Sequence, residues 1–136
     1  MNLKYRKLLS MIIKFRSGLE EAVQLKLNKE FKYEPYKIPY IISKNYLPDI
    51  EHQKKRIHVE VKGFFRVGDT KKYTSIRDSC PDWELVFIFS NPNKKVRKGS
   101  KICMGKWCDK EHFKYYTIDT VDMLVKYIGE KNVSGR

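Results

Sequence analysis

The chain has 136 residues, a formal net charge of +13 and a hydrophobic fraction of 41%, which together indicate one globular domain with a modest core and an anionic partner. That partner is nucleic acid or a membrane surface, because both carry negative charge. No apolar run approaches the roughly 18 residues that a membrane-spanning helix needs, and the apolar stretch of residues 8–13 is too short for a secretory signal, so we expect an intracellular protein with no membrane partner.

The N-terminal third begins with residues 1–14, which we interpret as a basic, flexible arm. The segment Ser17–Glu20 follows as a capping box, and apolar residues then recur at helical spacing, so we expect a helix that runs to about Lys29. Residues 31–42 contain two prolines. Because proline cannot donate a backbone hydrogen bond, this stretch suits an edge strand or a bridge.

The most informative stretch is residues 57–62, whose alternation of apolar and polar residues is typical of a strand. Its apolar residues fall on one face, and Glu60 and Lys62 project together from the other. If the chain reverses about residues 54–55, an antiparallel register sets Asp49 directly opposite Glu60, with Cβ atoms about 4.5 to 5.5 Å apart.

The C-terminal half predicts further elements in a mixed α/β order. Asp69 can cap a helix that runs through about Ser79 and ends before Pro81. Residues 83–89 include a continuous apolar run that is typical of a buried strand. We then expect a short helix over residues 104–112, a strand over residues 113–116 and a last helix over residues 120–128. Gly129 would stop this last helix.

The cysteines do not predict a disulfide scaffold, because they are three in number and form no C-x-x-C pair. Cys103, Cys108 and His112 share a roughly helical spacing, but a structural zinc site wants four ligands. We therefore do not expect structural zinc.

Asp49 and Glu60 would repel each other at this distance unless a divalent cation lay between them. Mg²⁺ and Mn²⁺ prefer carboxylate oxygens and water, and the neighbouring Lys62 can position a water or neutralise charge on a phosphate. The alternative is that both are solvated hairpin carboxylates with Lys62 as their ion-pair partner. Glu20 also has two interpretations, as the acid of the capping box or as a third carboxylate of a metal site.

Pro48 stands directly before Asp49, and one residue separates Glu60 from Lys62, which is the order found in the PD-(D/E)XK nucleases. The chain resembles the bacteriophage endonuclease I family, the Holliday-junction-resolving enzymes of the T-odd phages. Five segments in the same order carry this resemblance: Phe15–Glu20, Tyr46–Asp49, Val59–Gly63, Val86–Ser90 and Lys98–Ser100.

This resemblance implies a fold and an assembly. The fold would be α/β, with a restriction-endonuclease-like mixed sheet flanked by helices, in a segment-swapped homodimer. A single nuclease domain would cover residues 15–136. A bridging segment at about residues 36–45 would let the two subunits exchange their N-terminal parts.

The resemblance also implies an active site made of Glu20, Asp49, Glu60 and Lys62, with Glu20 coming from the other subunit of the dimer. The cofactor would be Mg²⁺ or Mn²⁺, one or two ions per active site. Its ligands would be Asp49, Glu60, Glu20 and the backbone carbonyl of Val61.

The implied activity is structure-selective, metal-dependent hydrolysis of paired phosphodiester bonds in Holliday and other branched DNA junctions, by a phage-encoded enzyme in the cytoplasm of its bacterial host. Two other functions fit the charge: a sequence-specific restriction or homing-type nuclease with the same chemistry, and a non-catalytic DNA-binding protein. Basic residues outside the site would contact DNA phosphates, or else are solvated surface charge. They are Arg16, Lys71, Lys72, Lys94, Lys95, Arg97, Lys98 and Lys101.

Overall fold

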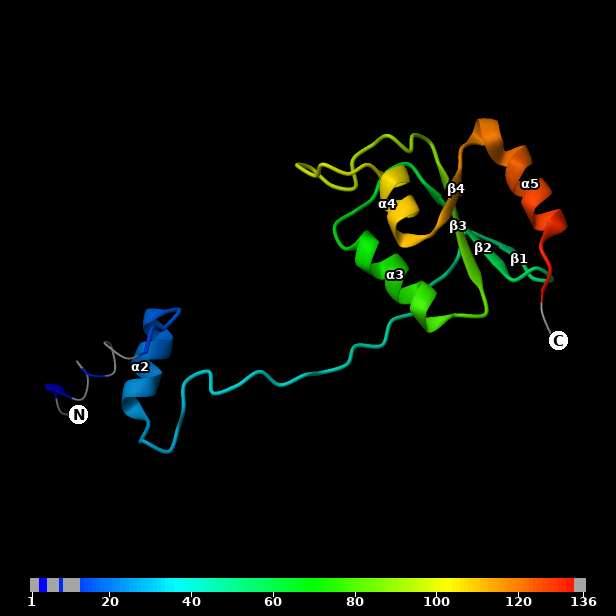
Figure 1. The fold of residues 1–136 in the computed structure, drawn as a ribbon. Coiled ribbons are helices and arrows are strands. Elements are labelled where there is room, and N and C mark those ends of the chain that lie inside the picture. Colours follow the sequence, from blue (N-terminus) through cyan, green and yellow to red (C-terminus); the bar gives the residue numbers. More distant parts are fainter. Residues whose placement is uncertain (1–2, 5–7, 9–12, 134–136) are drawn as a thin grey trace. The chain divides into compact units, whose positions relative to one another are not determined.

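The computed structural model describes residues 3–4, 8 and 13–133 of the chain. The chain forms two compact units, Met1–Ser43 and Lys44–Arg136 (Figure 1). The boundary between these units falls inside the predicted bridging segment of residues 36–45. Most of the predicted basic arm, residues 1–14, lies outside the described residues, so the arm stays a prediction.

The helix α2 of the first unit spans Gly18–Lys26. Ser17 is its N-cap, and the Ser17 hydroxyl accepts a hydrogen bond from the Glu20 N–H at 3.1 Å, which is the first half of the predicted capping box. The predicted end at about Lys29 was wrong. The chain leaves the helix earlier because the Asn28 side chain accepts a backbone N–H two residues further on, at 2.9 Å, and such local bonds compete with the helical ladder.

The apolar residues of α2 are mostly exposed. Leu19 is 76% exposed and Val23 is 49% exposed, whereas Leu25 is buried. The side chain of Gln24, which is also buried, donates to the Phe31 carbonyl at 2.9 Å. The apolar face that the sequence predicts for this helix is therefore left largely uncovered within the described part of the chain.

Residues 27–49 contain neither helix nor strand. The edge strand that was one alternative for residues 31–42 therefore does not form in this chain. The interpretation of residues 36–45 as a bridge stays a prediction.

The second unit is built on a four-stranded mixed sheet with the order β1-β2-β3-β4 (Figure 1). β1 is antiparallel to β2, and β3 is parallel to both of its neighbours. The mixed α/β fold class is therefore confirmed. The strands are β1 Ile50–His52, β2 Ile57–Lys62, β3 Glu84–Phe89 and β4 Lys114–Tyr116.

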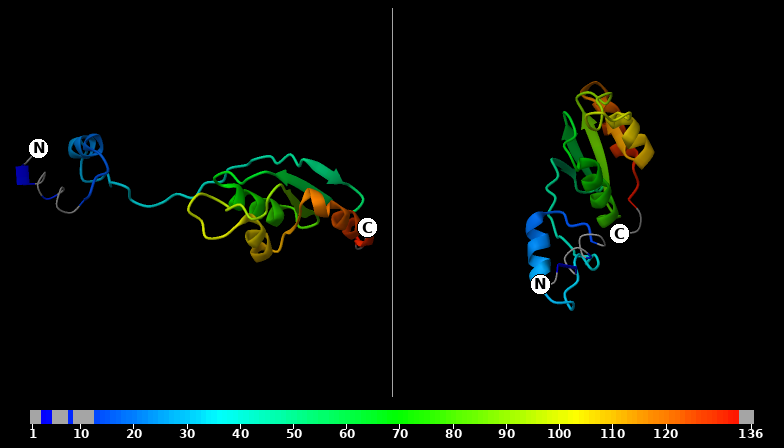
Figure 2. Two further views of the ribbon diagram at one scale, coloured as in Figure 1. Left: turned by 90° about the horizontal axis from the view of Figure 1, so that it is seen from above. Right: turned by 90° about the vertical axis from the view of Figure 1, so that its left-hand side faces the viewer.

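Helices cover both faces of this sheet (Figures 1 and 2). The helices α3, Asp69–Ser79, and α4, Met104–Glu111, pack on one face. A short 3-10 turn, Ile118–Thr120, leads into α5, Val121–Glu130, which packs on the other face. In the described ranges, no helix is long and apolar enough to cross a lipid bilayer.

The two faces of the sheet have different cores. On the α3 and α4 face the core is aromatic, and Tyr73, Phe87 and Phe89 are fully buried there. On the α5 face a smaller aliphatic cluster joins β2 and β3 to Leu124. Because β3 contributes to both clusters, the continuous apolar run of residues 85–89 is explained, and the prediction of a buried strand over residues 83–89 is confirmed.

In the second unit, two helix ends differ from the sequence prediction. Gly68, with a φ of 88°, is the N-cap of α3, so the predicted cap at Asp69 was wrong. The carboxylate of Asp69 turns back and accepts the Arg66 N–H at 2.8 Å. α5 continues past Gly129, so the predicted stop was also wrong. The Lys55 ammonium donates to two carbonyls at the end of α5, which satisfies groups that a helix terminus otherwise leaves unpaired.

Candidate active site

The hairpin of β1 and β2 has the predicted register. Ile50 faces Val59 and His52 faces Ile57, so the chain reverses about residues 54–55. Continuing the same register by one residue sets Asp49 opposite Glu60, as the alternation predicted. Asp49, Glu60 and Lys62 therefore lie around the end of β2, on the side of the sheet where β1 begins.

Glu60 is buried, with 6% of its surface exposed, and both of its carboxylate oxygens accept hydrogen bonds from tyrosines. The Tyr46 hydroxyl donates to Oε2 at 2.5 Å, and the Tyr73 hydroxyl donates to Oε1 at 2.9 Å. Burial and then the hydrogen bond to Glu60 raise the pKa of Tyr46, and burial and then the charge of Glu60 raise the pKa of Tyr73. Both hydroxyls therefore stay protonated and act as donors.

The ammonium of Lys62 lies between two carboxylates. Its Nζ atom is 3.7 Å from Glu60 Oε1 and 3.6 Å from Asp69 Oδ2. Asp69 is buried in the first turn of α3, so its negative charge is fixed in place. This arrangement holds the lysine head group next to Glu60.

The side chain of Asp49 contacts the backbone of β2. Its Oδ2 atom accepts the Val61 N–H at 2.8 Å, while the carbonyl of the next residue, Lys62, accepts the Ser90 N–H at 3.2 Å from the β3 side. The N–H and C=O of one strand residue point to the same neighbouring strand, and those of the next residue point to the opposite one. The Val61 carbonyl therefore faces the side of Asp49.

The donor chemistry of this cluster fits a hard divalent cation. Among the described residues, no group of three or more His, Cys, Asp and Glu side chains gathers as a metal site. Mg²⁺ usually binds proteins through only one or two carboxylates and keeps several waters. Asp49, Glu60 and the Val61 carbonyl supply oxygen atoms alone, and each oxygen of Glu60 keeps a lone pair beside its tyrosine bond.

Glu20 belongs to the first unit and is described with it. The Tyr33 hydroxyl donates to Glu20 Oε2, and this bond raises the pKa of Tyr33. Within the described residues, the carboxylate accepts from Tyr33 instead of completing the reciprocal half of the capping box with Ser17. Its side chain is therefore held by an aromatic residue, as that of Glu60 is.

The predicted DNA-contacting residues are exposed. The loop between β3 and α4 is anchored around residues 94–96, because the Lys94 ammonium donates to the Gly63 carbonyl at 3.1 Å and Val96 is buried in the aromatic core. Lys72 lies over the rings of Tyr46 and Tyr73, 5.6 and 5.4 Å from their centroids. Arg16, in the first unit, pairs with Glu34 at 2.6 Å. The remaining exposed basic residues of the predicted set are Lys71, Lys95, Arg97, Lys98 and Lys101.

The chain is similar in sequence to known proteins. The chain matches the phage endonuclease I family over residues 1–132. The chain belongs to the phage endonuclease I family. It is 36% identical over 107 residues to Endonuclease I of Escherichia phage T7, which covers 74% of this chain and 71% of that protein. It is 34% identical over 123 residues to Endodeoxyribonuclease 1 of Enterobacteria phage T3, which covers 86% of this chain and 77% of that protein.

Family membership confirms the resemblance that the five sequence segments carry. Three residues next to the site were not predicted from sequence, namely Tyr46, Tyr73 and Asp69, whose contacts with Glu60 and Lys62 are described above. Asp69 and Tyr73 are four residues apart on α3 and both are buried, and residues at this spacing share one face of a helix. That spacing was the available signal for a polar helix face turned toward the sheet.

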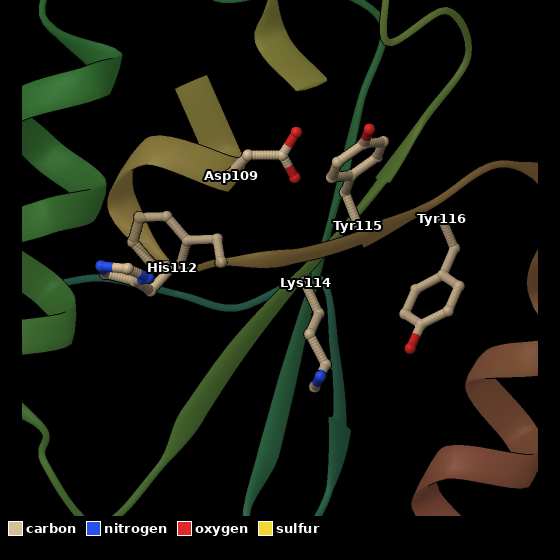
Figure 3. A pocket seen from close by; sticks show the side chains of 6 residues that line it. Asp109, His112, Lys114, Tyr115 and Tyr116 are labelled. Carbon is tan, nitrogen blue, oxygen red and sulfur yellow. The ribbon is translucent and has the colours of Figure 1, made fainter. Parts of the chain in front are cut away.

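A recess lies at the opposite edge of the sheet, against β4 and the end of α4 (Figure 3). Its lining includes Asp109, His112 and Tyr116. Since β3 separates β4 from β2, this recess is not part of the Asp49 and Glu60 cluster. The candidate site is instead built at the β1 and β2 side of the sheet.

Proposed function

We propose that the protein is a structure-selective, metal-dependent endodeoxyribonuclease that resolves four-way (Holliday) and branched DNA junctions by paired phosphodiester hydrolysis. The observation that carries this proposal is the register of β1 and β2, which sets Asp49 across from Glu60 with Lys62 alongside. The relatives from phages T7 and T3 are named as an endonuclease and an endodeoxyribonuclease, and a net charge of +13 suits a DNA substrate.

Asp49 and Glu60 would hold one or two Mg²⁺ or Mn²⁺ ions, with the Val61 carbonyl and Glu20 as further ligands. When bound, such an ion generates a nucleophilic water and neutralises charge on the phosphate. The water oxygen bonds to phosphorus, the bond from phosphorus to the 3′ oxygen breaks, and a proton ends on that departing oxygen. The products are a 5′ phosphate and a 3′ hydroxyl.

Lys62 orients the attacking water or the scissile phosphate. Its ammonium has three donors, and the two neighbouring carboxylate oxygens lie 3.6 and 3.7 Å away, so it keeps hydrogen-bonding capacity for the reaction. Asp69 holds this ammonium close to Glu60. The ion pair with Asp69 lets the Lys62 ammonium contact the phosphate while it stays next to Glu60.

Phosphate contacts outside the site would come from the exposed basic residues of the β3 to α4 loop, of α3 and of Arg16. Phosphate contacts position a protein on DNA without reading its sequence. The loop begins close to the site, because Lys94 bonds the carbonyl of Gly63, the residue after Lys62. This proximity supports a role in holding the backbone near the reacting phosphate.

The protein would act as a homodimer in the cytoplasm of a bacterial host, because two nicks on opposite strands of a junction require two sites in fixed relation. Exchange of the N-terminal parts through residues 36–45 would give each site its Glu20 from the partner subunit. Leu19 and Val23 lie four residues apart on one face of α2 and both are exposed. Ile41 is exposed as well. These exposed apolar side chains support an assembly in which a partner subunit covers them.

The exchange is tested by mixing two inactive proteins. Glu20→Gln and Lys62→Ala chains, allowed to exchange subunits, should form heterodimers with one intact site, made from Glu20 of one chain and Lys62 of the other. Such heterodimers should nick one strand of a junction. Inactive heterodimers, shown to have formed by native mass spectrometry, would mean that each site is built within one chain.

The junction-resolving activity is tested by comparing a synthetic four-way junction with a linear duplex of the same arm sequences, in Mg²⁺ and in EDTA. The proposal expects paired nicks in the junction with Mg²⁺, little cutting of the duplex, and no cutting in EDTA. Cutting of the duplex at one sequence would instead identify a sequence-specific nuclease. Junction binding without cutting, in Mg²⁺ as in EDTA, would identify a non-catalytic DNA-binding protein.

A further inference from the structure

Glu60 is unusually constrained for a carboxylate that is expected to bind a metal ion. Both of its oxygens accept hydroxyl hydrogen bonds, from Tyr46 and from Tyr73, and its side chain is buried. A buried acceptor that loses its donor has little access to replacement water, so each of these bonds matters more than one at the surface.

The two donors come from different parts of the fold. Tyr46 lies in the segment that leads to Asp49, and Tyr73 lies on α3. Their rings meet edge to face, with centroids 6.4 Å apart, and Tyr73 also packs edge to face on Phe87, with centroids 5.0 Å apart. Aromatic rings packed in this way have few alternative positions, so the hydroxyl groups are fixed before any ligand arrives.

This arrangement leaves the metal-binding capacity of Glu60 intact. An ionised carboxylate offers about four lone-pair sites, and the two tyrosines occupy one on each oxygen. The remaining sites are held in one orientation because the carboxylate cannot rotate without losing both bonds. A ligand that is already oriented does not lose rotational freedom when the ion binds.

We propose that Tyr46 and Tyr73 are positioning residues that hold the Glu60 carboxylate in the orientation required for binding a divalent cation. The inference rests on the proposed function, because it concerns the same metal site. Neither tyrosine touches the reacting atoms. Groups that hydrogen-bond to a metal ligand typically contribute 10-fold to 100-fold to metal affinity, and this is the range expected here.

The test is Mn²⁺ binding to the DNA-free protein, followed by the electron paramagnetic resonance signal of free Mn²⁺. Tyr73→Phe keeps the buried ring and removes only the hydroxyl, so it should weaken Mn²⁺ binding by about 10-fold or more. Tyr46→Phe should do the same. Circular dichroism melting of each variant would report any loss of stability separately.

Tyr127→Phe is the matched control. The Tyr127 hydroxyl also donates to a carboxylate, both oxygens of Glu84, with the Oε2 atom at 2.6 Å, but this pair joins α5 to β3 outside the candidate site. Its removal should cost stability and leave Mn²⁺ affinity unchanged. Equal Mn²⁺ affinity in the wild type, Tyr73→Phe and Tyr127→Phe would overturn the positioning role.

A Glu60→Gln variant separates this inference from the proposed function. If Glu60→Gln loses Mn²⁺ binding while the tyrosine variants keep it, only the positioning role is refuted. If the wild type and Glu60→Gln bind Mn²⁺ equally, Glu60 is not a metal ligand and the proposed metal site is refuted together with the role of the tyrosines.

Discussion

Replacing Lys94, Lys95 and Lys98 with alanine should weaken binding to every DNA shape and flatten its salt dependence. Lys94 and Lys95 each use one donor on a carbonyl, that of Gly63 at 3.1 Å and that of Lys101 at 3.3 Å. Because a lysine ammonium has three donors, both keep donors for a phosphate. All three lysines are exposed, so each is expected to contribute one phosphate contact.

The size of the effect follows from counterion release. Each phosphate contact on duplex DNA contributes a slope of about 0.9 in the logarithm of affinity against the logarithm of salt concentration. Three lost contacts therefore reduce the slope by about 2.7. Between about 50 and 200 mM salt, a fourfold change, the wild type should lose about 40-fold more affinity than the variant.

The assay is fluorescence anisotropy of a labelled junction and of a labelled duplex in EDTA, over a salt series. A control protein removes the same number of charges from exposed lysines on α4 and α5 that are outside the predicted DNA-contacting set. An unchanged slope in the loop variant, or the same reduction in the control, would refute the assignment and leave the loop lysines as solvated charge. The control positions are Lys106, Lys110 and Lys126.

Three further predictions concern catalysis and stability. Lys62→Ala and Glu60→Gln should each abolish Mg²⁺-dependent cleavage while gel-shift binding of a junction in EDTA survives; loss of both together would make this strand face a DNA contact. Asp69→Asn should lower kcat about 10-fold, equivalent to about 1.4 kcal/mol, with KM unchanged, because it removes the charge that holds the lysine; a change in KM alone would contradict this role. Gly129→Ala should raise Tm by a few degrees, because a Cβ there meets no atom within 4 Å and alanine stabilises a helix interior by about 0.5 to 1 kcal/mol over glycine; a lower Tm in thermal melting would count against the continued helix.

The strand pattern predicted the arrangement of these side chains well, because alternation of residues along a strand has only one consequence in a sheet. Once residues 57–62 form a strand and the chain reverses about residues 54–55, Glu60 and Lys62 must share a face and Asp49 must lie across from Glu60. The strand pattern left open whether these carboxylates are solvated. Glu60 is buried, and Tyr73 from α3 supplies it with a hydrogen-bond donor that a strand pattern cannot reveal.

Helix ends were predicted less well than strands, because a helix end depends on contacts distant in sequence. Gly129 has the local signature of a stop, but Lys55 from the β1 to β2 turn bonds the carbonyls at the end of α5. In α2 the apolar spacing predicted the helix but not which side is covered, since Leu19 stays exposed. Burial of a helical side chain depends on what packs against it, and helical spacing alone does not reveal that.

The geometry of α3 explains how one helix serves two neighbouring side chains of β2. Glu60 and Lys62 are two residues apart on a strand, a distance of about 6.6 Å, and Asp69 and Tyr73 are four residues apart on a helix, a rise of about 6 Å. Tyr73 contacts Glu60 and Asp69 contacts Lys62, so the helix runs antiparallel to the strand with nearly matching spacing. That direction is the one required between parallel strands such as β2 and β3. A shift of α3 by one residue would therefore separate both pairs at once, which makes the packing of this helix, and not only the identity of its residues, a condition for an ordered site.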